Sequence, residues 1–252
     1  MSEIAGRMHR PGGHSVAFRR IEGAEPTVVW LGGLKSDMGG TKAQALAEWA
    51  LANGRSFVRF DYFGHGESSG DFLHGTVGRW RDDALAVIDE LTQGDVVLVG
   101  SSMGGWIACL LALARPARVR ALTLIAPAAD FTDQLIWPSL TESQRETIER
   151  EGAWISPSTY EPPGLPLTRA LIEDGALWSI LPGPVEIGAP VRILQGARDR
   201  DVPWRHALKL GQAITAEDVV FTLIKDGDHR LSRPQDLKRM IAAVEELGGT
   251  SS

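Results

Sequence analysis

The chain has 252 residues, 43% of them hydrophobic and 23% charged, which suits one large α/β domain with a sizeable buried core. Its formal net charge of −6 makes the surface a poor partner for nucleic acid or for an anionic membrane. No uninterrupted apolar run approaches the roughly eighteen residues of a membrane span, and the single cysteine, Cys109, excludes an internal disulfide.

The N-terminal residues carry Glu3 and contain no apolar segment. We therefore expect no secretion signal. A lone cysteine also fits a reducing compartment. The cytoplasm is the predicted location.

Short β-branched runs alternate with helical patterns along the chain. The predicted strands are residues 28–31, 56–60, 95–99, 121–125, 191–194 and 219–224. The predicted helices are residues 41–52, 77–91, 103–114, 203–214 and 234–247. Several strands are apolar throughout, which is typical of strands buried on both faces of a parallel sheet. The alternation predicts an α/β fold with a mostly parallel, doubly wound sheet, and residues 14–21 are expected to add an antiparallel edge hairpin.

One segment interrupts this alternation. Residues 128–188 are rich in proline and contain Trp137, Trp154 and Trp178, and residues 141–151 have a highly charged helical pattern. A long insertion inside a compact domain is usually functional, often as a lid. We expect it to form a small cap over the functional site of a single domain that spans residues 1–252.

Residues 100–104 (GSSMG) match the pattern G-x-S-x-G. The pattern is weak by itself, but here it follows an apolar strand and opens an apolar helix, the context that a nucleophile elbow needs. Gly100 and Gly104 would let strand and helix pass closely, so that Ser102 projects its hydroxyl from a sharp turn above the sheet. Ser102 is the predicted nucleophile, and the N–H of Met103 is a predicted oxyanion donor. A Gly-rich turn with a buried serine is the alternative.

A serine hydroxyl needs a base within hydrogen-bond reach and a third group that orients this base. Downstream of Ser102 the histidines are His206 and His229. His206 falls inside a helical pattern and would be a surface residue. His229 follows the last predicted strand, where the base belongs in the chain order Ser, acid, His. His229 is therefore the predicted general base.

Two aspartates follow the predicted strand 191–194. Asp199 lies nearer the strand end and is the predicted orienting acid. Asp201 also qualifies by position, but it precedes a predicted helix and is expected to cap that helix. Asp228 is expected to be a solvated turn residue.

The loop after strand 28–31 should supply the second oxyanion donor. Its sequence, GGLKSD at residues 32–37, opens with two small residues that let the backbone approach a substrate carbonyl. The N–H of Leu34 is the predicted donor, with the N–H of Lys35 as the fallback. An ordinary loop is the alternative.

Other patterns point away from cofactors. Residues 63–70 (FGHGESSG) resemble a dinucleotide loop, but the third glycine comes one residue late and no helix opens there. There is no Walker A lysine motif, and no His, Asp, Glu and Cys spacing suggests a metal. We therefore expect neither a cofactor nor a metal. Cys109 falls on an apolar helix face and is expected to lie in the core.

Several longer motifs are shared with a known group of enzymes. They are GGLKSDMGGTK at 32–42, RFDYFGHG at 59–66, VGSSMGGWI at 99–107, GAWISPSTY at 152–160, VPW at 202–204 and DHR at 228–230. Together they resemble one branch of the serine hydrolases in the α/β-hydrolase superfamily, that of palmitoyl-protein thioesterases and acyl-glucuronide esterases. The resemblance implies the α/β-hydrolase fold, a triad that falls on Ser102, Asp199 and His229, and activity on acyl thioesters or acyl glucuronides. Gln195 departs from the histidine that many relatives carry before Gly196.

Residues and resemblance together predict a serine hydrolase that cleaves carboxylic esters or thioesters through an acyl-enzyme on Ser102. Its partner would be a small acyl ester or thioester, or an acylated protein. A tryptophan-bearing apolar cap, with Met103 and Leu34 at the floor of the site, suits an aliphatic acyl chain. No cluster of Arg or Lys marks a site for a large anion. A peptidase or amidase of the same fold, and a non-catalytic binding protein on this scaffold, are the alternatives.

Overall fold

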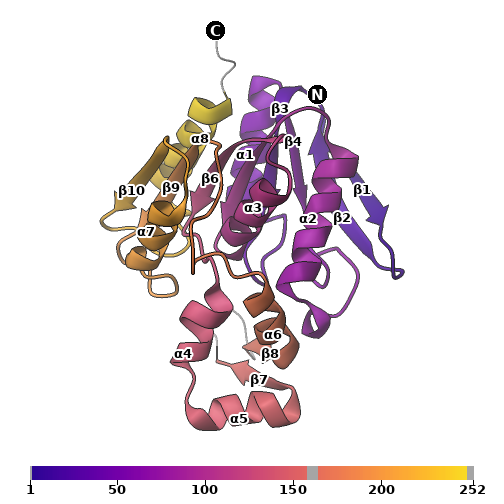
Figure 1. The fold of residues 1–252 in the computed structure, drawn as a ribbon. Coiled ribbons are helices and arrows are strands. Elements are labelled where there is room, and N and C mark those ends of the chain that lie inside the picture. The colour runs from indigo at the N-terminus through magenta and orange to yellow at the C-terminus, as the bar shows by residue number, and fades with distance from the viewer. Residues whose placement is uncertain (1, 158–163, 249–252) are drawn as a thin grey trace.

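A mixed sheet forms the centre of the molecule (Figure 1). The computed structural model describes residues 2–157 and 164–248. Within these residues eight strands pair in the order β1-β2-β4-β3-β5-β6-β9-β10. The strands are β1 (Ile4–His9), β2 (Ser15–Ile21), β3 (Ala24–Leu31), β4 (Arg55–Phe60), β5 (Val96–Ser101), β6 (Val119–Ile125), β9 (Val191–Gly196) and β10 (Val219–Ile224). β2 is antiparallel to both of its neighbours, and the remaining pairs are parallel. The predicted α/β fold with a mostly parallel sheet is confirmed.

Two groups of helices cover the two faces of this sheet. α1 and α8 pack over one hydrophobic cluster, and α2, α3 and α7 pack over the other, on the near side of the sheet in Figure 1. The helices are α1 (Thr41–Asn53), α2 (Val77–Leu91), α3 (Met103–Ala114), α7 (Trp204–Ala213) and α8 (Pro234–Gly248). α3 is apolar almost all round and is buried over most of its length, as is expected of a helix that packs against a central strand. Among the described helices, none combines the length and the apolar character that a membrane crossing requires.

The segment between β6 and β9 folds into small elements at one end of the sheet (Figure 1). They are η2 (Thr132–Ile136), α4 (Trp137–Ser139), α5 (Glu142–Glu151), β7 (Ala153–Ser156), β8 (Leu165–Thr168) and α6 (Arg169–Leu177). The predicted helix is present as α5, where Thr141 and Gln144 form a reciprocal capping box. Leu140, Ile148 and Leu167 give these elements a small hydrophobic cluster of their own. Part of the predicted 128–188 cap, residues 158–163, lies outside the described residues.

The N-terminal edge of the sheet differs from the prediction. Residues 14–21 supply only the second strand of the hairpin, because β2 pairs with β1 over Ile4–His9. β1 was missed since most of its side chains are exposed and only Met8 is buried, so it lacks the alternation of a half-buried strand.

The parallel strands β3, β5, β9 and β10 end at the same edge of the sheet, because their carboxyl ends point the same way. The loops that leave this edge, together with the first residue of α3, carry every residue predicted to act in catalysis. The fold therefore gathers side chains from distant parts of the sequence at one place.

Candidate active site

Ser102 stands at a sharp turn between β5 and α3. Its backbone angles, φ 54° and ψ −119°, lie in a region that residues other than glycine rarely adopt. A Cβ atom on Gly104 would lie 2.0 Å from the carbonyl oxygen of Leu31, and one on Gly100 would lie 2.3 Å from the oxygen of Gly104. The N–H of Ser102 donates to the carbonyl of Ile125 at 2.9 Å. The structure thus contains the strand–turn–helix predicted at residues 100–104, and close packing holds its strained tip.

His229 lies between Ser102 and Asp199. Its Nε2 is 3.1 Å from Ser102 Oγ, and its Nδ1 is 2.9 Å from Asp199 Oδ2. Because an ionised carboxylate only accepts hydrogen bonds, Nδ1 carries the proton and donates to Asp199. Nε2 of the neutral ring then accepts from the serine hydroxyl. Three side chains that the sequence singled out on separate loops are brought into one line of hydrogen bonds.

The side chain of Asp199 is fully buried, and both of its carboxylate oxygens accept hydrogen bonds. Oδ1 accepts the backbone N–H groups of Asp201 and Val202 at 2.9 and 2.8 Å. Oδ2 accepts Nε2–H of Gln195 at 3.0 Å in addition to the bond from His229. A buried carboxylate is stabilised by such donors. Gln195 is therefore a direct partner of the acid.

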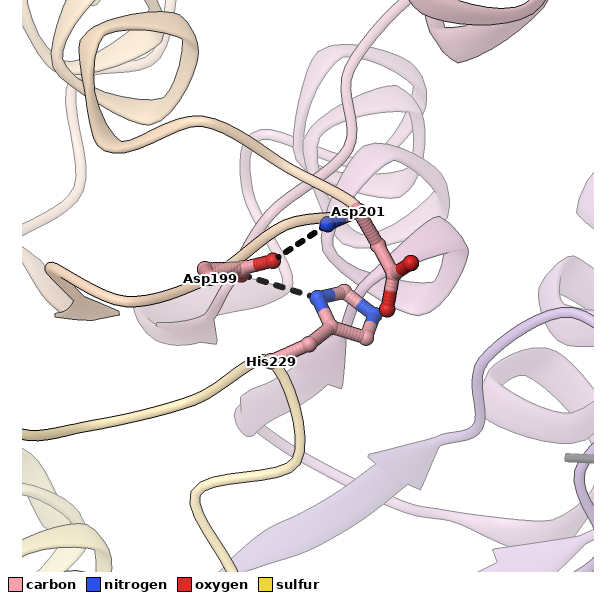
Figure 2. A group of neighbouring side chains, drawn as sticks. All are labelled: Asp199, Asp201 and His229. Atoms are coloured by element: carbon pink, nitrogen blue, oxygen red, sulfur yellow. Dashed lines mark hydrogen bonds and ion pairs between the residues drawn. The ribbon is translucent and has the colours of Figure 1, made fainter. Parts of the chain in front are cut away.

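Asp201, the alternative acid, occupies a different environment. It is exposed, and Figure 2 shows its carboxylate on the opposite side of the His229 ring from Asp199. The prediction that Asp201 caps the next helix is wrong, because α7 has Pro203 at its N-cap position and no side-chain cap. The loop turns instead around the buried Asp199, to which Asp201 gives its N–H.

Two further predictions concern His206 and Asp228. His206 lies on α7 as expected, but it is half-buried, and its Nε2–H donates to the carbonyl of Ala129 at 2.7 Å. It is therefore not a plain surface residue. Asp228 is exposed and accepts the N–H of Leu231 at 3.0 Å, which matches the predicted turn residue. Cys109 is completely buried in the core, also as predicted.

Asp199, Asp201 and His229 could also be considered as a metal site, since each offers a ligand atom within 4.8 Å of the others. A cation there would have to displace hydrogen bonds that both Asp199 oxygens and His229 Nδ1 already make. We therefore interpret the group in Figure 2 as a base with its orienting acid.

The loop after β3 makes a tight turn over residues 33–36. The N–H and the hydroxyl of Ser36 both donate to the carbonyl of Gly33, at 3.2 and 2.8 Å. The N–H of Lys35, the fallback oxyanion donor, is engaged by Nε2 of His65 at 3.0 Å. This leaves the N–H of Leu34 as the better candidate in this turn.

The same turn lies against the elbow. A Cβ atom on Gly33 would be 3.4 Å from the Cβ atom of Ser102, so backbone and nucleophile are close neighbours. Met103 is the first residue of α3, and its N–H therefore has no acceptor within the helix. Leu34 and Met103 are thus placed on two segments that flank Ser102.

A cavity of about 880 Å³ opens at Ser102. Its apolar lining includes Met103, Ala128, Phe131, Leu135, Ile136 and Leu165. Its polar lining includes Lys35, Asp37, Thr41, Lys42, Arg200, Asp201, Arg230 and Ser232. Most of the apolar residues come from the 128–188 insertion, and these polar residues come from the loops at the sheet edge and from the first turn of α1.

This lining corrects two expectations. Trp137, Trp154 and Trp178 are not among the residues that line the cavity. Trp137 and Trp154 pack in the insertion's own cluster, and Trp178 packs against the main core. The sequence also indicated no cluster of cationic residues, yet the cavity is lined by two lysines and two arginines together with two aspartates.

Lys42 illustrates how the fold assembles this polar wall. It is in the first turn of α1, and its Nζ donates to the carbonyl of Arg230, the residue after His229. Burial lowers the pKa of Lys42 to about 8. These neighbours are far apart in the sequence, so no local pattern could have indicated them.

The fold and this site define the class of the protein. A model described as "Alpha/beta hydrolase family" matches residues 36–240, and the chain belongs to that family. It is a hydrolase of this family, as the motifs implied.

One individual relative and two solved structures are also similar to this chain. The mitochondrial palmitoyl-protein thioesterase ABHD10 of mouse is 37% identical over 234 residues, which are 92% of this chain and 78% of the mouse protein. A solved structure of a putative hydrolase from Agrobacterium vitis S4 is 43% identical with a TM-score of 0.95, covering 99% of this chain and 100% of the other. The structure of mouse alpha/beta hydrolase domain-containing protein 10 is 35% identical with a TM-score of 0.90, covering 97% and 98%.

Proposed function

We propose that this hydrolase cleaves carboxylic esters or thioesters through an acyl-enzyme on Ser102. The observation that carries the proposal is the hydrogen-bonded series from Ser102 Oγ to His229 at 3.1 Å and from His229 to Asp199 at 2.9 Å. A serine hydroxyl is a poor nucleophile at neutral pH, and a base oriented in this way is what activates it.

In the first step Ser102 Oγ attacks the acyl carbon while Nε2 of His229 takes the hydroxyl proton. The N–H groups of Met103 and Leu34 donate to the oxyanion, and the N-terminus of α3 adds a favourable potential for negative charge. Asp199 stabilises the imidazolium through its bond to Nδ1–H.

His229 next gives this proton to the departing alcohol or thiol, and the acyl group stays on Ser102 as the acyl-enzyme. His229 then takes a proton from water as the water attacks the acyl carbon. The acid departs and Ser102 recovers its proton. The cycle consumes one water molecule and needs no cofactor or metal.

The two walls of the cavity support a placement for the two halves of the substrate. The apolar wall, with Leu135, Ile136 and Leu165, suits an aliphatic acyl chain. The polar wall, with Lys42 and Arg230, suits the departing group and the incoming water. In this proposal residues 128–188 act as a cap that supplies the acyl wall. Similarity to a mouse palmitoyl-protein thioesterase supports thioesters as well as esters.

Turnover of a short p-nitrophenyl ester tests the mechanism. Ser102→Ala and His229→Ala should each lower kcat by roughly 10⁴- to 10⁶-fold. Ser101→Ala is the matched control, since it removes the same hydroxyl one residue away and should keep kcat within about tenfold. A fluorophosphonate probe should label the wild type and not Ser102→Ala. Near-wild-type turnover in Ser102→Ala would remove this mechanism.

A matched ester, thioester and anilide of the same acyl chain test the substrate class. We expect hydrolysis of the ester and the thioester, and much slower hydrolysis of the anilide. A series of acyl-CoA and p-nitrophenyl esters of increasing chain length then tests the acyl wall. Preference for the anilide would indicate a peptidase, and flat activity across the series would contradict an acyl-chain pocket.

A further inference from the structure

His65 is a buried histidine that the proposed mechanism does not use. It is 3% exposed and belongs to the 63–70 loop, whose glycine pattern failed as a dinucleotide loop. Its Nδ1 is 3.1 Å from the carbonyl oxygen of Phe63, and its Nε2 is 3.0 Å from the backbone nitrogen of Lys35. Since the carbonyl accepts and the N–H donates, the ring is neutral, with its proton on Nδ1.

The orientation of this ring is fixed on several sides. Tyr62, Phe72 and Trp80 contact it edge to face, with centroid separations of 5.7, 5.2 and 5.2 Å. Trp80 Nε1–H donates to the same Phe63 carbonyl at 3.1 Å. The unprotonated Nε2 is therefore held so that it accepts a hydrogen bond from one direction, that of the Lys35 N–H.

Lys35 itself has an unusual backbone conformation. Its φ of 57° lies in the left-handed region that favours glycine. A positive φ at the third residue of a turn closed by a Ser36-to-Gly33 bond is the pattern of a type II turn. In this turn the peptide that carries the Lys35 N–H is turned over relative to the commoner type I. The bond to His65 favours that peptide orientation.

Asp61 ties the same two loops together at a second point. Its Oδ1 accepts the N–H of Met38 at 2.6 Å, and its Oδ2 accepts the N–H of Glu67 at 2.7 Å. A Cβ atom on Gly66 would lie 2.2 Å from Asp61 Oδ2, so the glycine is needed for this close approach. The 63–67 segment is therefore a rigid support for the segment that follows β3.

We infer that His65 is a positioning residue for the oxyanion hole. By accepting the Lys35 N–H it holds the 33–36 turn so that the neighbouring N–H of Leu34 faces the carbonyl that Ser102 attacks. This role rests on the proposed function. In this role, His65 of the FGHG motif contributes to the same acyl transfer without contacting the substrate.

Two substitutions of His65 separate this role from simple packing. His65→Leu removes the acceptor while keeping an apolar side chain of similar size. His65→Gln can place its Oε1 near the former position of Nε2 and restore the acceptor. His14→Leu is the control, because His14 contacts the ring of Phe63 at 5.2 Å but hydrogen-bonds Asp83 and not the turn.

The measurements are kcat and KM on a p-nitrophenyl ester, the thermal midpoint, and inhibition by two ketones with the same acyl chain. A trifluoromethyl ketone forms a tetrahedral adduct with the serine and places an oxyanion in the hole, whereas the methyl ketone reports ground-state binding. We expect His65→Leu to lower kcat and to weaken the trifluoromethyl ketone by about 100-fold each. KM and methyl ketone affinity should change by less than about threefold. His65→Gln should recover most of both losses.

Several results would overturn the inference. They are wild-type kcat in His65→Leu, equal weakening of both ketones, or an equal loss of kcat in His14→Leu at a similar thermal midpoint. If His65→Leu does not fold, His65→Asn makes the same comparison, since it keeps the donor to Phe63 but does not reach Lys35. A wild type that neither hydrolyses esters nor reacts with the trifluoromethyl ketone would overturn the proposed function as well. An active wild type beside an unimpaired His65→Leu would overturn only the role of His65.

Discussion

Asp199→Asn replaces the carboxylate by an amide of the same size. The hydrogen bonds made at this position determine how the amide is oriented. Asp199 Oδ1 accepts two backbone N–H groups, which cannot rearrange, so the asparagine oxygen is required on that side. The new NH₂ group then faces Nδ1 of His229, which must become an acceptor. The ring can meet this demand by moving its proton to Nε2, which faces Ser102.

In that tautomer His229 no longer accepts the serine proton. We expect kcat to fall about 10⁴-fold, or about 5.5 kcal/mol of transition-state stabilisation. KM should stay within about threefold, because Asp199 is not among the residues that line the cavity. The NH₂ group also opposes the donor of Gln195, so stability should fall by about 1–3 kcal/mol in urea unfolding.

Initial rates on a p-nitrophenyl ester, with active sites counted by probe labelling, measure this change. Asp201→Asn is the matched control and should keep kcat within about tenfold. A loss of about 10³-fold or more in Asp201→Asn, with Asp199→Asn close to wild type, would refute the assignment of the acid.

Three further predictions concern the elbow, the cavity and the buried histidine. Gly104→Ala should destabilise the fold by more than about 3 kcal/mol in urea unfolding, because its Cβ would meet the Leu31 carbonyl at 2.0 Å; an unchanged midpoint would contradict the packing of the elbow. Leu135→Trp should lower kcat/KM for a dodecanoyl ester about tenfold more than for an acetyl ester, whereas equal losses would speak against its place in the acyl wall. Burial and the nearby Lys35 charge lower the pKa of His65 from 6.5 to about 4, so folding keeps His65 neutral where the unfolded chain binds a proton. The free energy of unfolding of the wild type should therefore fall by about 3 kcal/mol more than that of His65→Gln between pH 6.5 and pH 4. Parallel pH profiles of the two free energies would contradict this.

The central elements could be predicted because their local patterns are strong. β5 is buried at every position and α3 is apolar almost all round, so sequence and environment agree. β1 could not be predicted in this way, because it contributes a mostly exposed edge strand and only Met8 to the core. Its position follows from pairing with β2, which is a tertiary property.

The residues of the site can likewise be divided into those that the sequence could predict and those that it could not. The order of nucleophile, acid and base along the chain, together with the strand ends, was enough to single out Ser102, Asp199 and His229 as neighbours. The helix-cap prediction for Asp201 failed because the buried acid draws the loop around itself through backbone N–H bonds. Bonds such as Lys35 to His65, thirty residues apart, exist only after the loops pack together. The cytoplasmic location stays a prediction.

Trapping the covalent intermediate tests the central claim most directly. Wild-type protein is mixed with a p-nitrophenyl ester, quenched in acid within the first turnovers, digested and examined by mass spectrometry. We expect one acyl group per chain on Ser102, no such adduct in Ser102→Ala, and far slower formation of the adduct in His229→Ala. An acyl group on a different residue, or wild-type turnover that persists in Ser102→Ala, would contradict the account.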